Sequence, residues 1–189
     1  MKTTKILFVF LILWLNVIWI YRIVSINKSA YRETAYHEMN ESFRFMDVEV
    51  KALEAHIYTP DEFEEKVGGV IGDKKDDDSM KIICMKLNIK NVSGRTISWD
   101  KLFSNETGLG FSSADKLWCG AYWPFYTANI TIVPGEAFED GEELDVWIST
   151  SMNKEAGFSR KTWENPTGRE YYYVLETYPN AQKIKLKFD

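Results

Sequence analysis

Histidine and cysteine most often carry nucleophilic or metal chemistry, and this 189-residue chain holds only two of each. His37 lies in a polar segment and His56 in a predicted strand, whereas Cys84 and Cys119 have no histidine or acid at a catalytic or zinc-binding spacing. The chain contains no Gly-x-Ser-x-Gly, His-Glu-x-x-His or P-loop motif. We therefore predict no catalytic residue, no metal site, no cofactor and a protein that is not an enzyme.

The 28 acidic residues keep one enzymatic alternative open, because two convergent carboxylates suffice for some hydrolytic reactions. Residues 73–78 (DKKDDD) gather four of these acids. The run lacks the alternating acids, the central glycine and the terminal glutamate of a calcium loop, so we predict a solvated loop.

Three aromatic residues are the candidate partner-binding residues: Trp118, Tyr122 and Trp147. In the apolar run 117–126, Trp118 and Tyr122 lie on the face opposite the odd-numbered residues, and Trp147 alternates against Val146 and Ile148. Rigid aromatic side chains often anchor recognition surfaces. The alternative is that other parts of the chain cover these rings: the polar segment 28–45, a short helix that the sequence predicts after Thr59, or a neighbouring loop.

The same alternation predicts that Cys84 and Cys119 form no stabilising disulfide. Cys84 lies opposite Ile83 and Met85, whereas Cys119 has the parity of the predicted core position Leu117. A bridge needs converging side chains with Cα atoms within about 7 Å. An oxidising compartment would favour the bridge, which stays open as an alternative.

Two parts of the chain, residues 6–26 and residues 46–189, have patterns that predict the structure in which a binding site would lie. Residues 6–26 are almost wholly apolar and long enough for a helix to cross a membrane. A signal cleavage site needs small residues at −3 and −1, but a cut after Ser25 would put Ile23 at −3 and a cut after Ala30 would put Lys28 there. We predict residues 1–27 as an uncleaved transmembrane signal-anchor and 28–45 as a juxtamembrane spacer. A cleaved signal peptide is the alternative.

Residues 46–189 alternate between apolar and polar positions in short runs separated by turn residues, which is typical of a β-sandwich. Strands are predicted at 47–58, 80–89, 96–99, 117–126, 130–133, 144–149, 171–175 and 183–188. Thr59, Pro60 and Glu62 form a capping-box pattern that predicts a helix of about two turns, ending at the glycine pair 68–69.

The net charge of the chain limits the kinds of partner that we expect. The net charge is −5, and because residues 1–27 hold three basic residues and no acid, the remainder carries 20 basic and 28 acidic residues, a net charge of −8. An acidic domain does not favour nucleic acid, and the predicted contacts are a membrane through 6–26 and a protein or peptide partner.

Several segments resemble a known kind of protein. They are 55–66 (AHIYTPDEFEEK), 87–94 (LNIKNVSG), 133–136 (VPGE), 171–175 (YYYVL), the pair 178–179 (YP) and 184–188 (IKLKF). Together they resemble small, membrane-anchored Gram-positive domains of unknown function, similar to the telokin-like, immunoglobulin-like sandwiches of bacterial lipoproteins. The resemblance implies an immunoglobulin-like β-sandwich outside the cytoplasmic membrane and supplies no catalytic residues. This chain departs from lipoproteins in lacking a cysteine for lipid attachment.

The leading functional hypothesis is an interaction module of the bacterial cell envelope. The first alternative is a protective or immunity protein that sequesters a cationic peptide or toxin, which the acidic charge favours. The second is an enzyme with a convergent carboxylate pair.

Overall fold

The computed structural model describes residues 2–30, 34–68, 78–98, 110–113, 116–118, 137–156, 158–177 and 180–188. Its described strands form two larger sheets and one strand pair, with orders β1-β11-β10-β6-β7, β2-β3-β4-β9 and β5-β8. The strands are β1 (Ala35–Glu38), β2 (Ser42–Phe45), β3 (Val48–Tyr58), β4 (Met80–Asn91), β5 (Ile97–Ser98), β6 (Gly110–Ser113), β7 (Lys116–Trp118), β8 (Ala137–Phe138), β9 (Glu143–Asn153), β10 (Tyr171–Glu176) and β11 (Gln182–Leu186).

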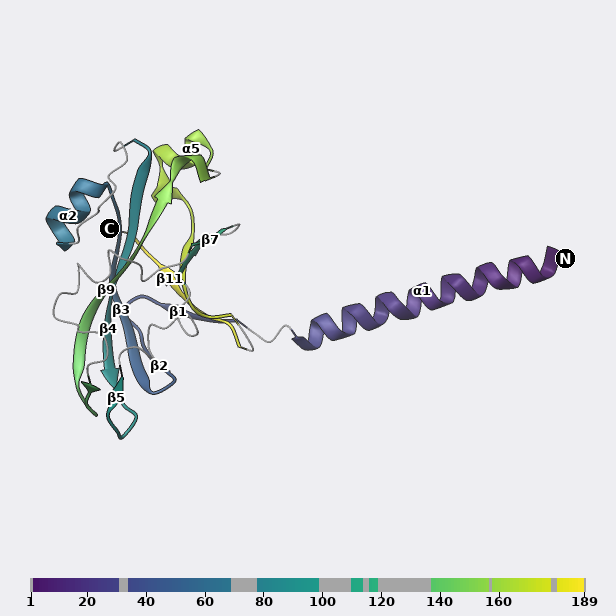
Figure 1. Cartoon of the computed structure of the whole chain (residues 1–189), viewed down its shortest axis with the longest axis horizontal. Helices are drawn as coiled ribbons and strands as arrows, with labels where there is room; N and C mark the ends of the chain where they lie inside the picture. Colours follow the sequence, from purple (N-terminus) through teal and green to yellow (C-terminus); the bar gives the residue numbers. More distant parts are fainter. Residues whose placement is uncertain are drawn as a thin grey trace.

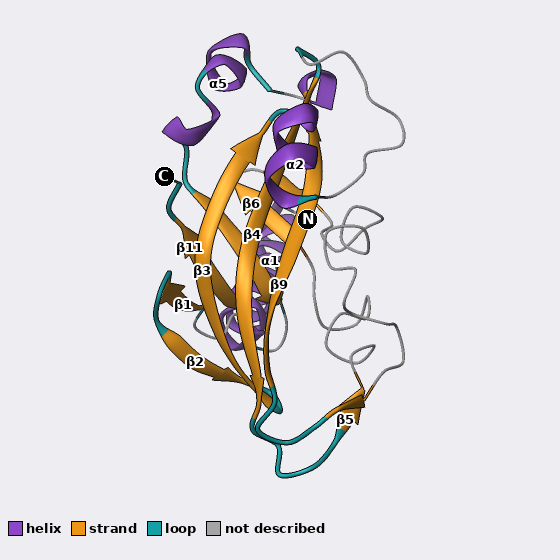
Figure 2. Ribbon diagram, turned by 90° about the vertical axis from the view of Figure 1, so that its left-hand side faces the viewer, coloured by secondary structure: helices purple, strands orange, loops and turns teal. Residues whose placement is uncertain are grey.

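The helices are α1 (Lys2–Ala30), α2 (Pro60–Val67) and α5 (Arg160–Glu164), with short 3-10 turns η1 (Lys154–Ala156) and η2 (Pro166–Gly168). Figure 1 shows α1 projecting away from the sheets, and Figure 2 shows α2 lying across the outer face of the sheet that contains β3, β4 and β9.

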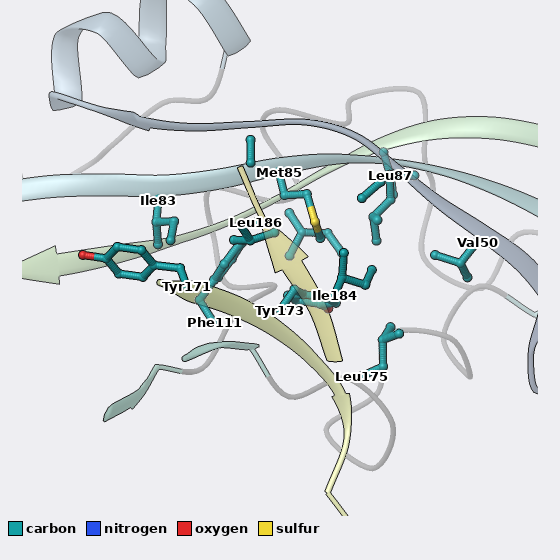
Figure 3. Packing of buried hydrophobic residues seen from close by; sticks show 14 of the residues in the cluster. Val50, Ile83, Met85, Leu87, Phe111, Tyr171, Tyr173, Leu175, Ile184 and Leu186 are labelled. Atoms are coloured by element: carbon teal, nitrogen blue, oxygen red, sulfur yellow. The ribbon is translucent and has the colours of Figure 1, made fainter. Parts of the chain in front are cut away.

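One hydrophobic core fills the space between the four-stranded and five-stranded sheets. The first sheet contributes Ile83, Met85 and Leu87, and the second contributes Tyr171 and Ile184, all at most 1% exposed. Figure 3 shows these two sets of side chains facing one another. Two sheets that share one buried interior form a β-sandwich, so the predicted architecture is confirmed.

The buried face of a strand is predicted correctly where apolar and polar residues alternate regularly in the sequence. On β4, Ile83, Met85, Leu87 and Ile89 are buried in the core, as predicted. Strands β9, β10 and β11 also lie within two residues of their predicted bounds at most ends, although β9 continues to Asn153. The predicted strand at 130–133 and most of 117–126 lie outside the described residues.

β3 contains an irregularity that the alternation does not reveal. The register with β4 shifts between Ala52, which pairs with Leu87, and Glu54, which pairs with Lys86, so Leu53 is the extra residue. Such a bulge reverses the parity of every later residue on the strand. It places Ala55 in the core and turns Glu54 and its even-numbered successors to the outer face.

Helix α2 begins and ends as predicted. The Glu62 backbone N–H donates to Thr59 Oγ1 at 3.3 Å, and the Thr59 backbone N–H donates to Glu62 Oε2 at 2.9 Å, which completes the capping box. Gly68 ends the helix with φ +83°, a left-handed conformation that residues with a Cβ adopt at a cost. The local sequence therefore fixes both ends of the element that covers the outer face.

The structure differs from the predicted spacer at 28–45, because two strands lie within it. β1 pairs in parallel with β11, and β2 pairs antiparallel with β3, so the chain crosses from one sheet to the other between them. The rings of His37 and Phe43 stack across this crossing with centroids 3.5 Å apart. Both strands have four residues, which is too short for a distinct periodic pattern: β1 is mostly exposed and shows no apolar alternation, and β2 alternates only through Phe43 and Phe45.

Helix α1 confirms a helix over the predicted anchor and extends it to Ala30. Its described side chains run from Ile12 to Ile26. Within the described residues, no helix has both the length and the apolar character of a membrane span. The membrane anchor and the immunoglobulin-like topology therefore stay predictions.

Candidate functional site

The outer face of the four-stranded sheet carries the most chemically varied side chains of the described sandwich. Register places its residues in rows across three strands, because directly paired residues point to the same face. Tyr58 pairs with Ile82, His56 with Cys84, and Glu54 with Lys86. β9 completes these rows with Ser151, Ser149 and Trp147.

α2 covers one end of this face. Phe63 of the helix is 0% exposed and packs with Met80, Ile82 and Cys84 in a second, smaller apolar cluster. Three residues lie partly buried at its margin: Tyr58, Val67 and Trp147. The helix therefore converts one end of the outer sheet face into a second, smaller core and leaves the rings of Tyr58 and Trp147 at its edge.

Cys84 belongs to this smaller cluster and is a free, buried thiol. Its Sγ donates to the His56 carbonyl oxygen at 3.7 Å, and burial raises the pKa of the thiol to about 12. Because the thiolate is the nucleophilic form, a thiol with this pKa is unreactive at neutral pH. Cys84 therefore packs as an apolar side chain, and Cys119 lies outside the described residues.

The His56 imidazole joins a carboxylate to two aromatic rings. Its Nε2 lies 3.1 Å from Glu54 Oε2, and its ring stacks on Tyr58 with centroids 4.9 Å apart and planes inclined by 15°. The Trp147 ring lies 6.3 Å away at 42°. We call Glu54, His56, Tyr58 and Trp147 the His56 cluster.

The cluster is partly open to solvent. The His56 side chain is 17% exposed and that of Glu54 is 39% exposed. Lys66 Nζ lies 4.9 Å from the centroid of the Tyr58 ring, a cation–π geometry, and burial raises the pKa of the Tyr58 hydroxyl. The arrangement therefore offers aromatic surface, a carboxylate and an imidazole within one small area.

Beyond Trp147 the outer face becomes a network of paired charges. Asn88 Nδ2 donates to Asp145 Oδ1 at 2.8 Å and to Glu143 Oε1 at 2.9 Å, and Lys86 Nζ lies 3.2 Å from Asp145 Oδ2. The Asn88 hydrogen bond, followed by that of Lys86, lowers the pKa of Asp145. These groups satisfy one another and act as a polar border to the cluster.

Of the three predicted aromatic residues, the structure describes the side chain of Trp147 alone. Trp147 lies on the outer face of the four-stranded sheet, as alternation predicts, and is partly buried. Trp118 belongs to β7 in the five-stranded sheet, and its side chain and Tyr122 lie outside the described residues. The combined surface of Trp118, Tyr122 and Trp147 stays a prediction.

His56 and Tyr58 are the site residues that the sequence reading missed. They alternate with Glu54 along the strand, and this spacing is the signal that places them on one face. The apolar residues around them obscured the pattern, because the bulge at Leu53 reverses parity just before it begins.

In the part of the chain that the structure describes, no group of three histidine, cysteine or acidic residues lies close enough together to hold a metal ion. Residues 73–77 of the acidic run lie outside that part.

Fold and site together define a small two-sheet β-sandwich whose distinctive surface is an aromatic and polar patch. Residues 32–182 match the family model described as a domain of unknown function (DUF5028), and the chain belongs to this family. This membership and the sandwich architecture confirm one part of what the resemblance implies, namely a β-sandwich domain of unknown function. No curated protein matches the chain.

Solved structures similar to this chain come from Bacillus anthracis, Bacillus subtilis and Clostridium difficile. A conserved hypothetical protein from Bacillus anthracis has 14% identity and a TM-score of 0.50, covering 80% of this chain and 95% of that one. The yjhA protein from Bacillus subtilis has 11% identity and a TM-score of 0.47, covering 80% and 99%. An uncharacterized beta-sandwich protein from Clostridium difficile 630 has 11% identity and a TM-score of 0.42, covering 83% and 98%. At such identities, the Bacillus anthracis likeness concerns the fold alone.

Proposed function

We propose that this chain is a membrane-anchored module whose immunoglobulin-like sandwich lies outside the cytoplasm and binds a protein or peptide partner. The observation that carries the binding role is the partly exposed His56 cluster beside α2. Aromatic rings lose little conformational freedom on binding and present large contact areas, and partly buried rings already have a fixed orientation.

The remaining outer face supports this choice of surface. Lys86, Asn88 and Asp145 bind one another, so a partner would have to break existing contacts to use them. A central aromatic patch beside a polar border is the usual anatomy of a protein interface. Trp147 is thus the expected anchor, with Trp118 and Tyr122 as the further aromatic residues that the sequence predicts.

The membrane anchor is proposed from the composition of α1. Described side chains on all sides of the helix are apolar and exposed, with Trp14, Trp19 and Tyr21 at least 70% exposed. A helix that is hydrophobic all round requires burial in a protein core or in a membrane. The sequence adds six apolar residues at 6–11, which brings the stretch to the length of a membrane span.

A binding role is favoured over nucleophilic catalysis by the state of Cys84. Its thiol is buried, donates to a carbonyl and has a pKa raised to about 12. The His56 imidazole is engaged with Glu54 and does not contact this sulfur through its ring in the described geometry. We therefore propose that the chain is not an enzyme and needs no cofactor.

The decisive experiment is chemical crosslinking in intact cells that express the full chain. We expect the protein to resist carbonate extraction from membranes and to crosslink to one partner. Trp147→Ala should lower partner recovery at least fivefold, while the melting temperature falls by only a few degrees.

Tyr36→Ala is the matched control, because Tyr36 is an aromatic residue, 60% exposed, on the edge strand of the other sheet. It should leave recovery unchanged. If wild type and Trp147→Ala recover equal amounts of the crosslinked partner, the proposed binding site on the outer face is wrong. If carbonate extracts the protein from membranes, the proposed membrane anchor is wrong.

A further inference from the structure

One polar side chain, Asn16, interrupts the apolar run of α1 from residue 6 to residue 21, whereas Arg22 and Ser25 lie near the far end of the predicted span. Asn16 stands midway between residues 6 and 26, ten residues from either end of the apolar stretch. Its Nδ2 donates to the Ile12 carbonyl oxygen at 2.8 Å, one turn back along the same helix. An amide has two N–H donors and an accepting oxygen, so this bond satisfies a minority of its capacity.

The position of Asn16 makes its remaining donor and acceptor groups energetically costly to leave without hydrogen bonds. If α1 spans the membrane, as the proposed function holds, the amide lies at the centre of the hydrocarbon, where neither water nor lipid headgroups reach it. A polar group in that environment is stabilised by hydrogen bonds from a neighbouring helix. The neighbour must offer a donor and an acceptor at the same depth.

A second copy of this chain offers both. We propose that α1 forms a parallel, two-fold symmetric dimer in which the Asn16 amides of two chains hydrogen-bond to each other. The proposal rests on the membrane anchor. An amide is self-complementary, because its N–H can donate to the carbonyl oxygen of an identical amide across the two-fold axis.

The residues around Asn16 supply a seam for this pairing. Val9 and Ile23 stand seven residues before and after it, and β-branched residues at this spacing, with one asparagine among them, favour a register-specific pair of helices. Membrane helix pairs commonly adopt the same left-handed crossing as soluble coiled coils. Ile12, Trp19 and Ile20 lie three or four residues from Asn16 and flank it on the same face.

The opposite side of the helix provides a matched comparison. Ile18 lies about 200° around the helix axis from Asn16, whereas Ile23 shares its face. The two isoleucines are equally exposed in the single chain, at 43% and 44%. Truncating either to alanine removes the same atoms, so only the geometry of a dimer distinguishes them.

The experiment uses the full chain in vesicles of phosphatidylcholine and phosphatidylglycerol, labelled at the N-terminus with donor or acceptor dyes. Energy transfer is followed as the protein is diluted with lipid. We expect Asn16→Leu to weaken the association about tenfold, and Asn16→Gln, which keeps the amide, to retain most of it. Ile23→Ala should weaken it by a smaller factor, and Ile18→Ala should leave it unchanged.

The outcomes separate this inference from the proposed function. Flotation of the vesicles reports anchoring for every variant. Chains that float but show only the energy transfer of randomly placed monomers, or an Asn16→Leu variant that associates like wild type, overturn the dimer and leave the anchor intact. Equal effects of Ile18→Ala and Ile23→Ala also overturn it. A chain that does not float overturns the membrane anchor and, with it, the dimer.

Discussion

The two faces of β4 come from one alternating strand and differ in what covers them. On the inner face, Ile83, Met85 and Leu87 are buried against the five-stranded sheet along the length of the strand. On the outer face, Ile82 and Cys84 are equally buried, but only where α2 lies over them. Sheet packing buries a whole face, whereas a two-turn helix buries a patch and creates a border.

That border is where the candidate site lies. Trp147 pairs with Lys86 in the row next to Cys84, so the outer face changes from apolar to charged within one row. Side chains at such a border are held by packing on one side and remain open on the other. This combination is what a recognition surface needs, and the described residues of the inner face of β4 show no equivalent border.

The largest expected effect compares the phenylalanines that fill the two regions. Phe111 lies in the inner core and Phe63 anchors α2, and both are 0% exposed. We expect Phe111→Ala to lower the free energy of unfolding by about 4 kcal/mol and Phe63→Ala by about 3 kcal/mol, because a short helix relaxes more easily than a sheet. Urea denaturation measures both. A larger loss for Phe63→Ala would mean that the small cluster is the main core.

The next prediction concerns the reactivity of Cys84 beneath α2. With its thiol pKa raised to about 12 by burial, iodoacetamide at pH 8 should modify Cys84 in the native protein at least about a hundredfold more slowly than in denaturant. Peptide mass spectrometry assigns the modification to Cys84 separately from Cys119. Phe63→Ala should restore much of the rate, and fast labelling of the wild type would contradict the burial of this face.

A smaller effect is expected from the cap that positions the cover. Thr59→Ala removes the hydroxyl that accepts the Glu62 N–H, and should lower stability by about 1 kcal/mol. Thr59→Ser keeps the acceptor and should cost much less. Hydrogen exchange should show the loss concentrated in α2. Uniform loss across the sandwich would indicate that the helix is not a separate cover.

These comparisons also show what the sequence could predict. The capping box of α2 and the regular alternation of β4 are local patterns, so residues such as Thr59, Gly68 and Met85 were placed correctly from sequence. Local hydrogen-bonding and periodicity determine these features without reference to the rest of the fold.

Other features depend on distant pairing. Strand β1 carries no alternation because it lies at a sheet edge, and it is recognisable only through its parallel partner β11. The bulge at Leu53 depends on the register with β4, and it decides that His56 faces outward beside Trp147. The candidate site was therefore predictable at Trp147 alone, since its other members need the tertiary register.

The smallest expected effect tests the polar border. Asp145 has a pKa lowered mainly by its hydrogen bond from Asn88, so its charged form is favoured in the folded state. A lowered pKa adds stability that is present above the ordinary carboxyl pKa, near 3.9, and is lost as the pH falls through the folded value. Because the Asp145 side chain is 40% exposed, solvent screening limits this contribution to about 0.5 kcal/mol.

Asp145→Asn should therefore be less stable than wild type by this small amount at pH 6, and the two proteins should become equal near pH 2. Glu143→Gln is the control, since Glu143 also accepts from Asn88 but does not contact Lys86 in the described contacts. Salt at 1 M should reduce the Asp145→Asn difference, because screening weakens exposed ion pairs. A difference that persists unchanged at low pH would assign the effect to packing at the border instead of charge.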